Sequence, residues 1–260
     1  MKGMKGTRGM RGMKKEWLSM LFVSVVMFCF SVTGCTSMKA KPSEGAGFVP
    51  VKEMTKREDL PFHSTWVKAG VDWKKYKSLY VKDVNTQYLL EANWWQQSVR
   101  KDKMEADVRE VAGYMKQEFK SAFRGDPQNR FQVVESPAEG ALVLEMALTE
   151  LIPSHPVMEA LSIAAPYGSG IAVQAAAKES GAKATVAFEA KIKDAATGEV
   201  LAMAADREQG KAAPINLRAL TWYKEAEGII NEWAGQFVQI ANRRPGEIVK
   251  DSSPFTLKPW

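Results

Sequence analysis

Cys35 is the residue whose type and setting most clearly predict a chemical modification. It follows residues 32–34 (VTG) at the end of an apolar run that begins at residue 17. The chain has only one other cysteine, Cys29, and that residue lies inside the apolar run. A thiol is a nucleophile, so this setting makes Cys35 the candidate for a covalent modification.

The segment before Cys35 has the organisation of a secretory signal. Six Lys and Arg and one Glu stand in the first 16 residues, the apolar stretch covers residues 17–30, and small residues follow it. A transmembrane helix is the alternative, but it needs about 20 predominantly apolar residues, and Ser31, Thr33 and Gly34 end this run early. We therefore predict a signal peptide over residues 1–34, with cleavage after Gly34.

Cleavage at this position changes what the composition implies. The whole chain carries a formal charge of +6, with 36 Lys and Arg against 30 Asp and Glu. The leader holds six of the basic residues and one of the acidic ones, so 30 basic and 29 acidic residues remain, a charge of +1. A near-neutral exported domain gives no support to nucleic-acid binding. It also has no pair of thiols for a disulfide or a cysteine metal site.

Residues 32–35 resemble the lipobox of bacterial lipoproteins: an aliphatic residue, a small residue, glycine and cysteine. The resemblance implies two or three acyl chains on Cys35, and a second chain converts marginal membrane binding into stable anchoring. Residue 36 is Thr and not Asp, which by the same resemblance implies sorting to the outer membrane. We expect a lipid-anchored protein whose domain faces the periplasm.

Other residue types that do chemistry stand in weak settings. His63 lies in a polar segment, and His155 follows Ser154 between two prolines. A metal site needs further ligands at regular spacing, and a hydrolase needs an acid and an oxyanion hole. Residues 168–170 (GSG) lack the Lys-Ser/Thr of a phosphate loop. We expect no catalytic residues, no cofactor and no metal.

Three aromatic residues are candidate contacts for a partner protein. Trp94 and Trp95 are adjacent, and Tyr167 lies in the Ala- and Gly-rich residues 157–182. Tryptophan is enriched in interface hot spots, but aromatic rings also fill cores, so core packing is the alternative for the tryptophans. Residues 157–182 are long for a connection, which predicts either a partner-binding flap or ordinary packed helices.

The mature chain divides into three parts by composition. Residues 35–70 mix Lys, Pro, Ser, Gly and Glu without a sustained period, which predicts a flexible tether behind the lipid. Residues 71–242 carry the regular patterns and are long enough for one substantial core. Residues 243–260 form a tail after the breaker residues Pro245 and Gly246.

The regular patterns predict an α+β domain. Apolar alternation predicts five strands, at residues 77–88, 130–135, 141–152, 183–193 and 200–208. Spacings of three and four predict helices at 100–123 and at 216–241, the second with Asn216 as its N-cap. Gly198 suits the turn of a hairpin. We expect an antiparallel-rich sheet of about five strands with two long helices packed on one face.

Three short stretches resemble domain-of-unknown-function family 3313, a group of bacterial lipoproteins. They are residues 47–49 (GFV), 70–76 (GVDWKKY) and 194–202 (DAATGEVLA), and the resemblance covers about residues 45–240. The chain departs from the pattern at Ala196, where a polar residue is expected, and after Arg243. The resemblance implies an envelope lipoprotein with a single domain and assigns no activity, because the family has none established.

These observations favour a non-enzymatic lipoprotein of the outer membrane that serves as an interaction or envelope-assembly module, with a protein partner and no nucleic acid. One alternative is a periplasmic hydrolase or glycan-acting enzyme, which a cleft with paired acids or a Ser-His-acid set would favour. Another is a carrier of a small apolar ligand, which a deep apolar cavity would favour.

Overall fold

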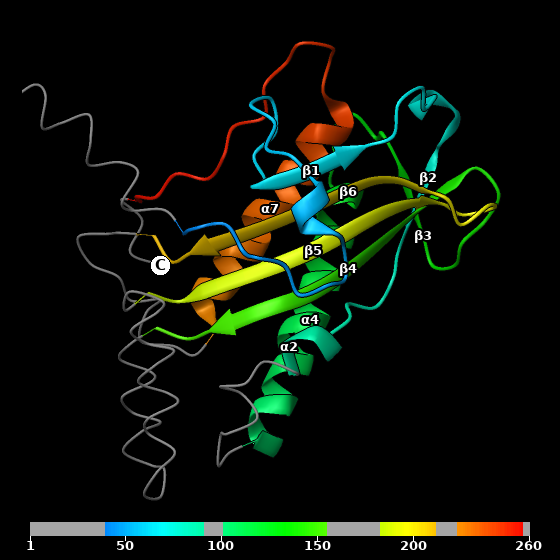
Figure 1. Ribbon diagram of the computed structural model, residues 1–260. Helices are drawn as coiled ribbons and strands as arrows, with labels where there is room; N and C mark the ends of the chain where they lie inside the picture. Colours follow the sequence, from blue (N-terminus) through cyan, green and yellow to red (C-terminus); the bar gives the residue numbers. More distant parts are fainter. Residues whose placement is uncertain (1–39, 91–100, 155–182, 212–222, 257–260) are drawn as a thin grey trace, which may run out of the picture. The chain divides into compact units, whose positions relative to one another are not determined.

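One mixed β-sheet forms the centre of the fold (Figure 1). A computed structural model describes residues 40–90, 101–154, 183–211 and 223–256, and Ala40–Trp260 form one compact unit. Within the described residues the sheet has six strands, in the order β1-β6-β5-β4-β2-β3. Their bounds are β1 Ser64–Val67, β2 Ser78–Val81, β3 Gln132–Val134, β4 Ala141–Ile152, β5 Thr185–Asp194 and β6 Val200–Gln209.

Most strand pairs are antiparallel. The neighbours β1 and β6, β6 and β5, and β5 and β4 run antiparallel, whereas β2 is parallel to both β3 and β4. The expected α+β class and the antiparallel-rich sheet are confirmed. The strand count differs from the expected five because Ser64–Val67, which are too short to show a period, pair with β6 as an edge strand.

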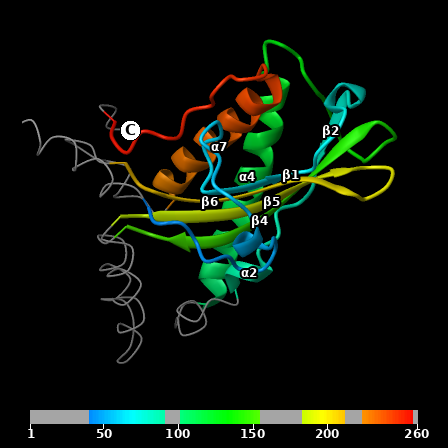
Figure 2. The ribbon, with the colours of Figure 1, turned by 45° about the horizontal axis from the view of Figure 1, so that its top comes forward.

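Two long helices lie on the same face of the sheet, as Figure 2 shows. These are α4 (Lys101–Arg124) and α7 (Lys224–Asn242), and the remaining helical segments are short: η2 Val51–Glu53, η3 Trp73–Lys75 and α2 Gln87–Leu90. Among the described residues, no helix is both long and apolar enough to cross a membrane. The 3.6-residue period buries one stripe of α4, including Val108, Met115 and Phe119.

The core between the sheet and these helices is strongly aromatic. Phe188 of β5 meets Trp233 of α7 edge to face, with ring centroids 4.6 Å apart. Phe237 lies 5.1 Å from both Phe62 and Phe119, measured between centroids. Edge-to-face and tilted ring pairs add specific attraction to the burial of their apolar surface. These contacts fix α7 against β5 and against the segment that precedes β1.

A β-bulge keeps β4 apolar toward the helices along its full length. Leu144, Met146 and Leu148 follow the period of two, but the next core residue is Leu151, three positions on. The register with β5 shifts between Leu148 and Glu150, which adds one residue to β4 at that point. Leu151 thereby returns to the helix-covered face, and the carboxylate of Glu150 pairs with Arg207.

Two boundaries differ from the sequence expectation, and a third agrees with it. The strand expected at residues 77–88 is shorter, because β2 ends at Val81. The helix α2 begins at Gln87, whose backbone N–H donates to the side-chain oxygen of Asn85. The second long helix, α7, begins at Lys224 with Tyr223 as its N-cap, so the expected N-cap Asn216, which lies outside the described residues, is wrong for this helix. Its C-cap is Arg243, as the basic end and the following breakers predicted.

The expected tether over residues 35–70 is wrong for its part from residue 40 onward. Val49 and Met54 are buried against Ala205, on the face of the sheet opposite α4 and α7, where Figure 2 shows residues 40–53 in blue. Phe62 is only 2% exposed and belongs to the main core. The tail also returns to the body, because Val249 is buried and its N–H donates to the Asp59 carbonyl. Tertiary contacts thus order segments whose composition shows no period.

The β5–β6 hairpin turn is organised by Asp194. Its carboxylate accepts the N–H groups of Ala196 and Thr197 at 2.9 and 3.1 Å and the Tyr76 hydroxyl at 2.7 Å. Gly198 has a φ of +71°, the left-handed conformation that the turn requires and that glycine adopts without strain. The predicted hairpin is confirmed, and Asp194 ties its turn to the segment before β2.

We expect Asp194 to make stability depend on acid pH. The hydrogen bond from Tyr76, together with those from the turn N–H groups, lowers the pKa of Asp194 against the opposing effect of burial. A lowered folded-state pKa contributes stability above the unfolded value of about 4, and this contribution is lost as the pH falls. The free-energy difference between wild type and Asp194→Asn should therefore be larger at pH 7 than at pH 3 in urea unfolding. Tyr76→Phe should shrink the same pH dependence, and a difference that does not vary with pH would contradict this role.

Candidate functional site

A cavity of about 350 Å³ lies between the sheet and the C-terminal ends of α4 and α7. Strands β2, β4, β5 and β6 supply one wall, and the two helix ends supply another. The most buried apolar residues of the lining are Leu79, Leu142, Leu144, Ala190, Phe62 and Phe123. Small-molecule pockets are concave, mostly apolar and about 300–1,000 Å³ in volume, so this cavity is the candidate functional site.

Small side chains on the sheet leave this space open. Ala190 of β5 and Ala204 of β6 are opposite each other in the strand register, and both face the cavity. The neighbour of Ala190 deeper in the core is large: Phe188, two residues earlier on β5, packs against Trp233. The change from Phe188 to Ala190 along β5, with Ala204 beside it on β6, accounts for the gap between the sheet and the end of α7.

Two arginines at the cavity share one carboxylate. Asp59 accepts hydrogen bonds from Arg57, at 2.6 Å from Nη2 and 2.9 Å from Nε, and from Nη1 of Arg243 at 2.5 Å. The hydrogen bond from Arg57 is the largest cause of the lowered pKa of Asp59, burial opposes it, and Arg243 lowers that pKa further. Asp59 therefore stays ionised, and its single negative charge is shared by two positively charged guanidinium groups.

Two more arginines, Arg130 and Arg244, line the cavity. Arg130 donates to the carbonyl oxygens of Trp73 and Tyr76, and its guanidinium carbon lies 4.2 Å from the ring centroid of Phe131. Carbonyl acceptors fix its position without cancelling its charge. Arg244 is exposed, and its side chain makes no hydrogen bond or ion pair within the part of the chain that the structure describes. The cavity thus combines an apolar interior with a cationic rim.

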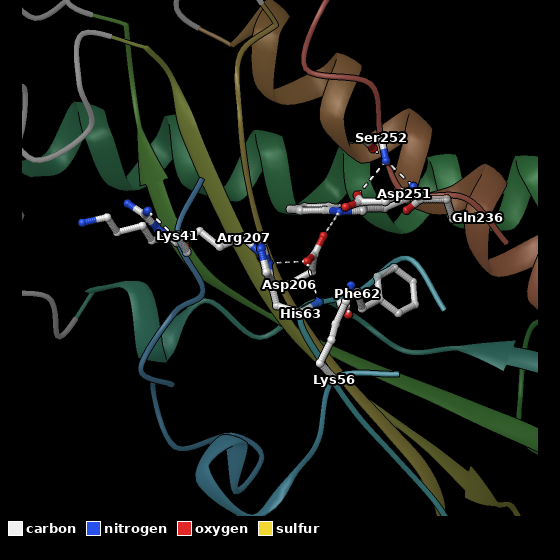
Figure 3. Close-up of polar contacts among 10 residues, drawn as sticks. Lys41, Lys56, Phe62, His63, Asp206, Arg207, Gln236, Asp251 and Ser252 are labelled. Carbon is white, nitrogen blue, oxygen red and sulfur yellow. Dashed lines mark hydrogen bonds and ion pairs between the residues drawn. The ribbon is translucent and has the colours of Figure 1, made fainter. Parts of the chain in front are cut away.

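A second polar cluster lies at β6, next to the edge strand β1 (Figure 3). Asp206 is 2% exposed, and its carboxylate accepts from Nε1 of Trp233 at 2.8 Å and lies 2.7 Å from Nδ1 of His63. It also accepts the N–H of His63 at 3.0 Å. These donors occupy both carboxylate oxygens, so the cluster joins the segment before β1 to β6 and α7. We interpret it as a structural tie.

Neither cluster assembles catalytic machinery from the described residues. His63 contacts Asp206 and the N–H of Arg207, with no described serine or cysteine bonded to its ring. Across residues 40–90, 101–154, 183–211 and 223–256, no three His, Cys, Asp or Glu side chains gather so that they could hold a metal ion. What the described geometry offers is a place for an apolar molecule beside fixed positive charge.

The residues singled out in the sequence fall mostly outside the described part of the chain. Cys35, Gly34, Trp94, Trp95 and Tyr167 all lie there, as do His155 and residues 168–170. His63 is described, and the structure moves it from the expected tether into the tie with Asp206.

The sequence offered little signal for the cavity arginines. Arg57 stands in the segment that was expected to be a tether, and Arg243 and Arg244 read only as the basic end of a helix. Arg130 begins a short strand segment whose partner is remote in sequence. Only the fold brings these three segments to one opening.

Comparisons with known proteins agree with the family resemblance. A family model described as "Protein of unknown function (DUF3313)" matches residues 47–237, close to the coverage expected from the three short stretches. This match confirms that resemblance. A search of curated proteins finds no match.

Solved structures of PelC, a dodecamer from Paraburkholderia phytofirmans, are similar to the chain at low identity. The wild-type dodecamer shares 11% identity at a TM-score of 0.37, covering 66% of this chain and 96% of that one. A single-residue variant gives 10% identity at the same TM-score, with coverages of 66% and 97%. At this TM-score the likeness carries no conclusion about fold or function.

Proposed function

We propose that this chain, which belongs to the DUF3313 family of proteins of unknown function, is a non-enzymatic, lipid-anchored binding protein of the bacterial envelope. Its ligand would be a small, largely apolar molecule held between the sheet and the helices. The observation that carries the proposal is the cavity of about 350 Å³ with its apolar interior. Each methylene group that a ligand buries there contributes about 0.8 kcal/mol, so a short alkyl chain gains useful affinity.

The localisation is part of the proposal. The basic leader, the apolar run and the VTGC motif support cleavage after Gly34 and a lipid on Cys35. Thr36 supports sorting to the outer membrane, with the domain facing the periplasm. The proposal also includes a protein partner in the envelope, which contacts Trp94, Trp95 and Tyr167. It does not include binding to nucleic acid.

Binding of an uncharged fluorophore tests the ligand site directly. The chain from residue 36 onward, without leader and lipid, is suitable because the described body belongs to one compact unit that begins at Ala40. We expect N-phenyl-1-naphthylamine to gain fluorescence on saturable, stoichiometric binding, and 1-dodecanol to displace it. A linear, non-saturating response would contradict the proposed function.

Two neighbouring alanines provide a matched pair of variants. Ala204 lines the cavity, whereas Ala205 faces the opposite side of the sheet and is buried against Val49 and Met54. We expect Ala204→Leu to fill part of the cavity, to weaken fluorophore binding at least tenfold and to raise the free energy of unfolding by about 1 kcal/mol. Ala205→Leu should overpack its site, cost about 1–3 kcal/mol and leave binding unchanged. Titration and urea unfolding measure both effects, and equal losses of binding would contradict the assignment.

A further inference from the structure

We infer that the cavity takes a single-chain amphiphile with an anionic head, whose alkyl chain fills the apolar interior while its head meets Arg57, Arg243 and Arg244. This inference rests on the proposed function and adds the chemical class of the ligand. It follows from how charge is distributed around the opening.

The charge of the lining is one-sided. Four of its residues are arginines, and none is Asp or Glu. Among the described residues, the carboxylate that accepts from the guanidinium groups is Asp59, which Arg57 and Arg243 share, whereas Asp126 and Glu247 accept the backbone N–H groups of Arg130 and Arg244. Two guanidinium groups thus share one carboxylate, and those of Arg130 and Arg244 bond none among the described residues. An anion would be attracted there, and a cation would be repelled.

Burial separates the two kinds of surface. Phe62, Leu144 and Ala190 are at most 2% exposed, whereas the Arg57 and Arg243 side chains are 39% and 21% exposed and Arg244 is open to solvent. The apolar surface thus lies inside and the guanidinium groups lie toward water. An amphiphile has the same order of parts, with its chain desolvated and its head within reach of solvent.

Guanidinium groups suit the proposed head group. Each presents a planar fork of N–H donors that matches the two oxygens of a carboxylate or a phosphate. A competing explanation is that these arginines only neutralise the negative C-terminal ends of α4 and α7. The acceptors of these side chains do not support it. The Arg243 side chain donates to Asp59, and that of Arg130 donates to Trp73 and Tyr76. None of these acceptor residues lies in the last turn of α4 or α7.

Displacement of N-phenyl-1-naphthylamine by amphiphiles of equal chain length tests the inference. Dodecanoate, dodecyl phosphate, 1-dodecanol and dodecyltrimethylammonium are added below their micelle-forming concentrations at pH 8. We expect both anions to displace the fluorophore at concentrations at least tenfold below that of 1-dodecanol, and the cation to be the weakest. The stronger of the two anions identifies the head group as carboxylate-like or phosphate-like. Equal potency of anion and alcohol would overturn the inference yet leave the proposed function standing, whereas failure of the fluorophore itself to bind would remove both.

Substitutions at the rim link the preference to particular residues. Arg244→Gln should reduce the preference for dodecanoate over 1-dodecanol at least threefold, and Arg243→Gln should act in the same direction. Asp59→Asn removes the competing carboxylate and should strengthen dodecanoate binding, an effect opposite to that of simple damage to the fold. Lys250→Gln, an exposed cation of the same tail outside the lining, is the control and should change nothing. A preference that survives Arg243→Gln and Arg244→Gln together would overturn the assignment.

Discussion

Replacing Asp206 with Ala is expected to lower the free energy of unfolding by about 3–5 kcal/mol. The carboxylate is 2% exposed, accepts from Trp233 Nε1 and from the His63 backbone N–H, and lies 2.7 Å from Nδ1 of the His63 ring. Its removal leaves two buried donors without an acceptor, and each unsatisfied buried donor costs about 1–3 kcal/mol when water cannot replace the lost partner. The tie holds the β1 edge, β6 and α7 together, so the loss should appear in global unfolding by urea.

The ion pair between Asp83 and Lys116 provides a control, because it has the same N–O distance but an exposed carboxylate. Its N–O distance is 2.7 Å, the same as that between Asp206 and His63, but the Asp83 side chain is 92% exposed. Asp83→Ala should cost about 1 kcal/mol or less, because water screens an exposed pair and solvates the freed lysine. Trp233→Phe removes one donor together with part of a fully buried ring, so it should cost more than Asp83→Ala. If Asp206→Ala cost no more than Asp83→Ala, the interpretation of the cluster as a structural tie would be wrong.

The parts of the fold that could be predicted are those whose signal is local. The strand at 141–152 coincides with β4, because an apolar face of Leu142, Leu144, Met146 and Leu148 gives a period of two over many residues. The helix at 100–123 agrees with α4 to within one residue at each end for the corresponding reason. Long elements average out their irregular positions, so their periods survive in the sequence.

The parts that could not be predicted depend on remote contacts. Strand β1 has four residues, and only Thr65 among them is buried, so no alternation marks it. It forms because Ser64–Val67 meet β6, about 140 positions later in the chain. His63 and Asp206 likewise come together only through that pairing. Composition marked residues 40–70 as unable to fold alone, and the sheet supplies the partner that composition could not show.

The cavity was beyond prediction for a different reason. A cavity exists where side chains fail to fill the space between elements, and this depends on how far apart the fold holds those elements. Ala190 and Ala204 read in the sequence as ordinary members of an apolar face, which is also what they are in the structure. The residue types alone do not show that a cavity separates these alanines from Phe237 and Ile240 of α7. They also do not show that four arginines line that cavity.

Glu189→Ala is expected to release the segment that packs on the other face of the sheet. Glu189 is 1% exposed, and its two carboxylate oxygens accept the N–H groups of Ala46 and Val49 at 2.5 and 2.6 Å. A hydrogen bond to a charged group contributes about 1.5–3 kcal/mol, so losing both exceeds what the small apolar contact of Val49 and Met54 with Ala205 can offset. Amide hydrogen exchange in residues 46–54 should accelerate at least tenfold, while exchange in β4 and β5 stays near its wild-type rate.

Lys191→Ala is the graded control, because Lys191 lies over the Phe48 ring at 4.3 Å and holds the same segment through a weaker cation–π contact. It should accelerate the same amides by less than Glu189→Ala does. The consequence reaches the proposed anchor, since residues 46–54 stand between Cys35 and the sheet in sequence. Releasing these nine residues adds roughly 30 Å of extended chain to the connection. If Glu189→Ala leaves exchange in residues 46–54 unchanged, Glu189 does not set where the folded body begins, and the length of the anchor connection must be controlled elsewhere.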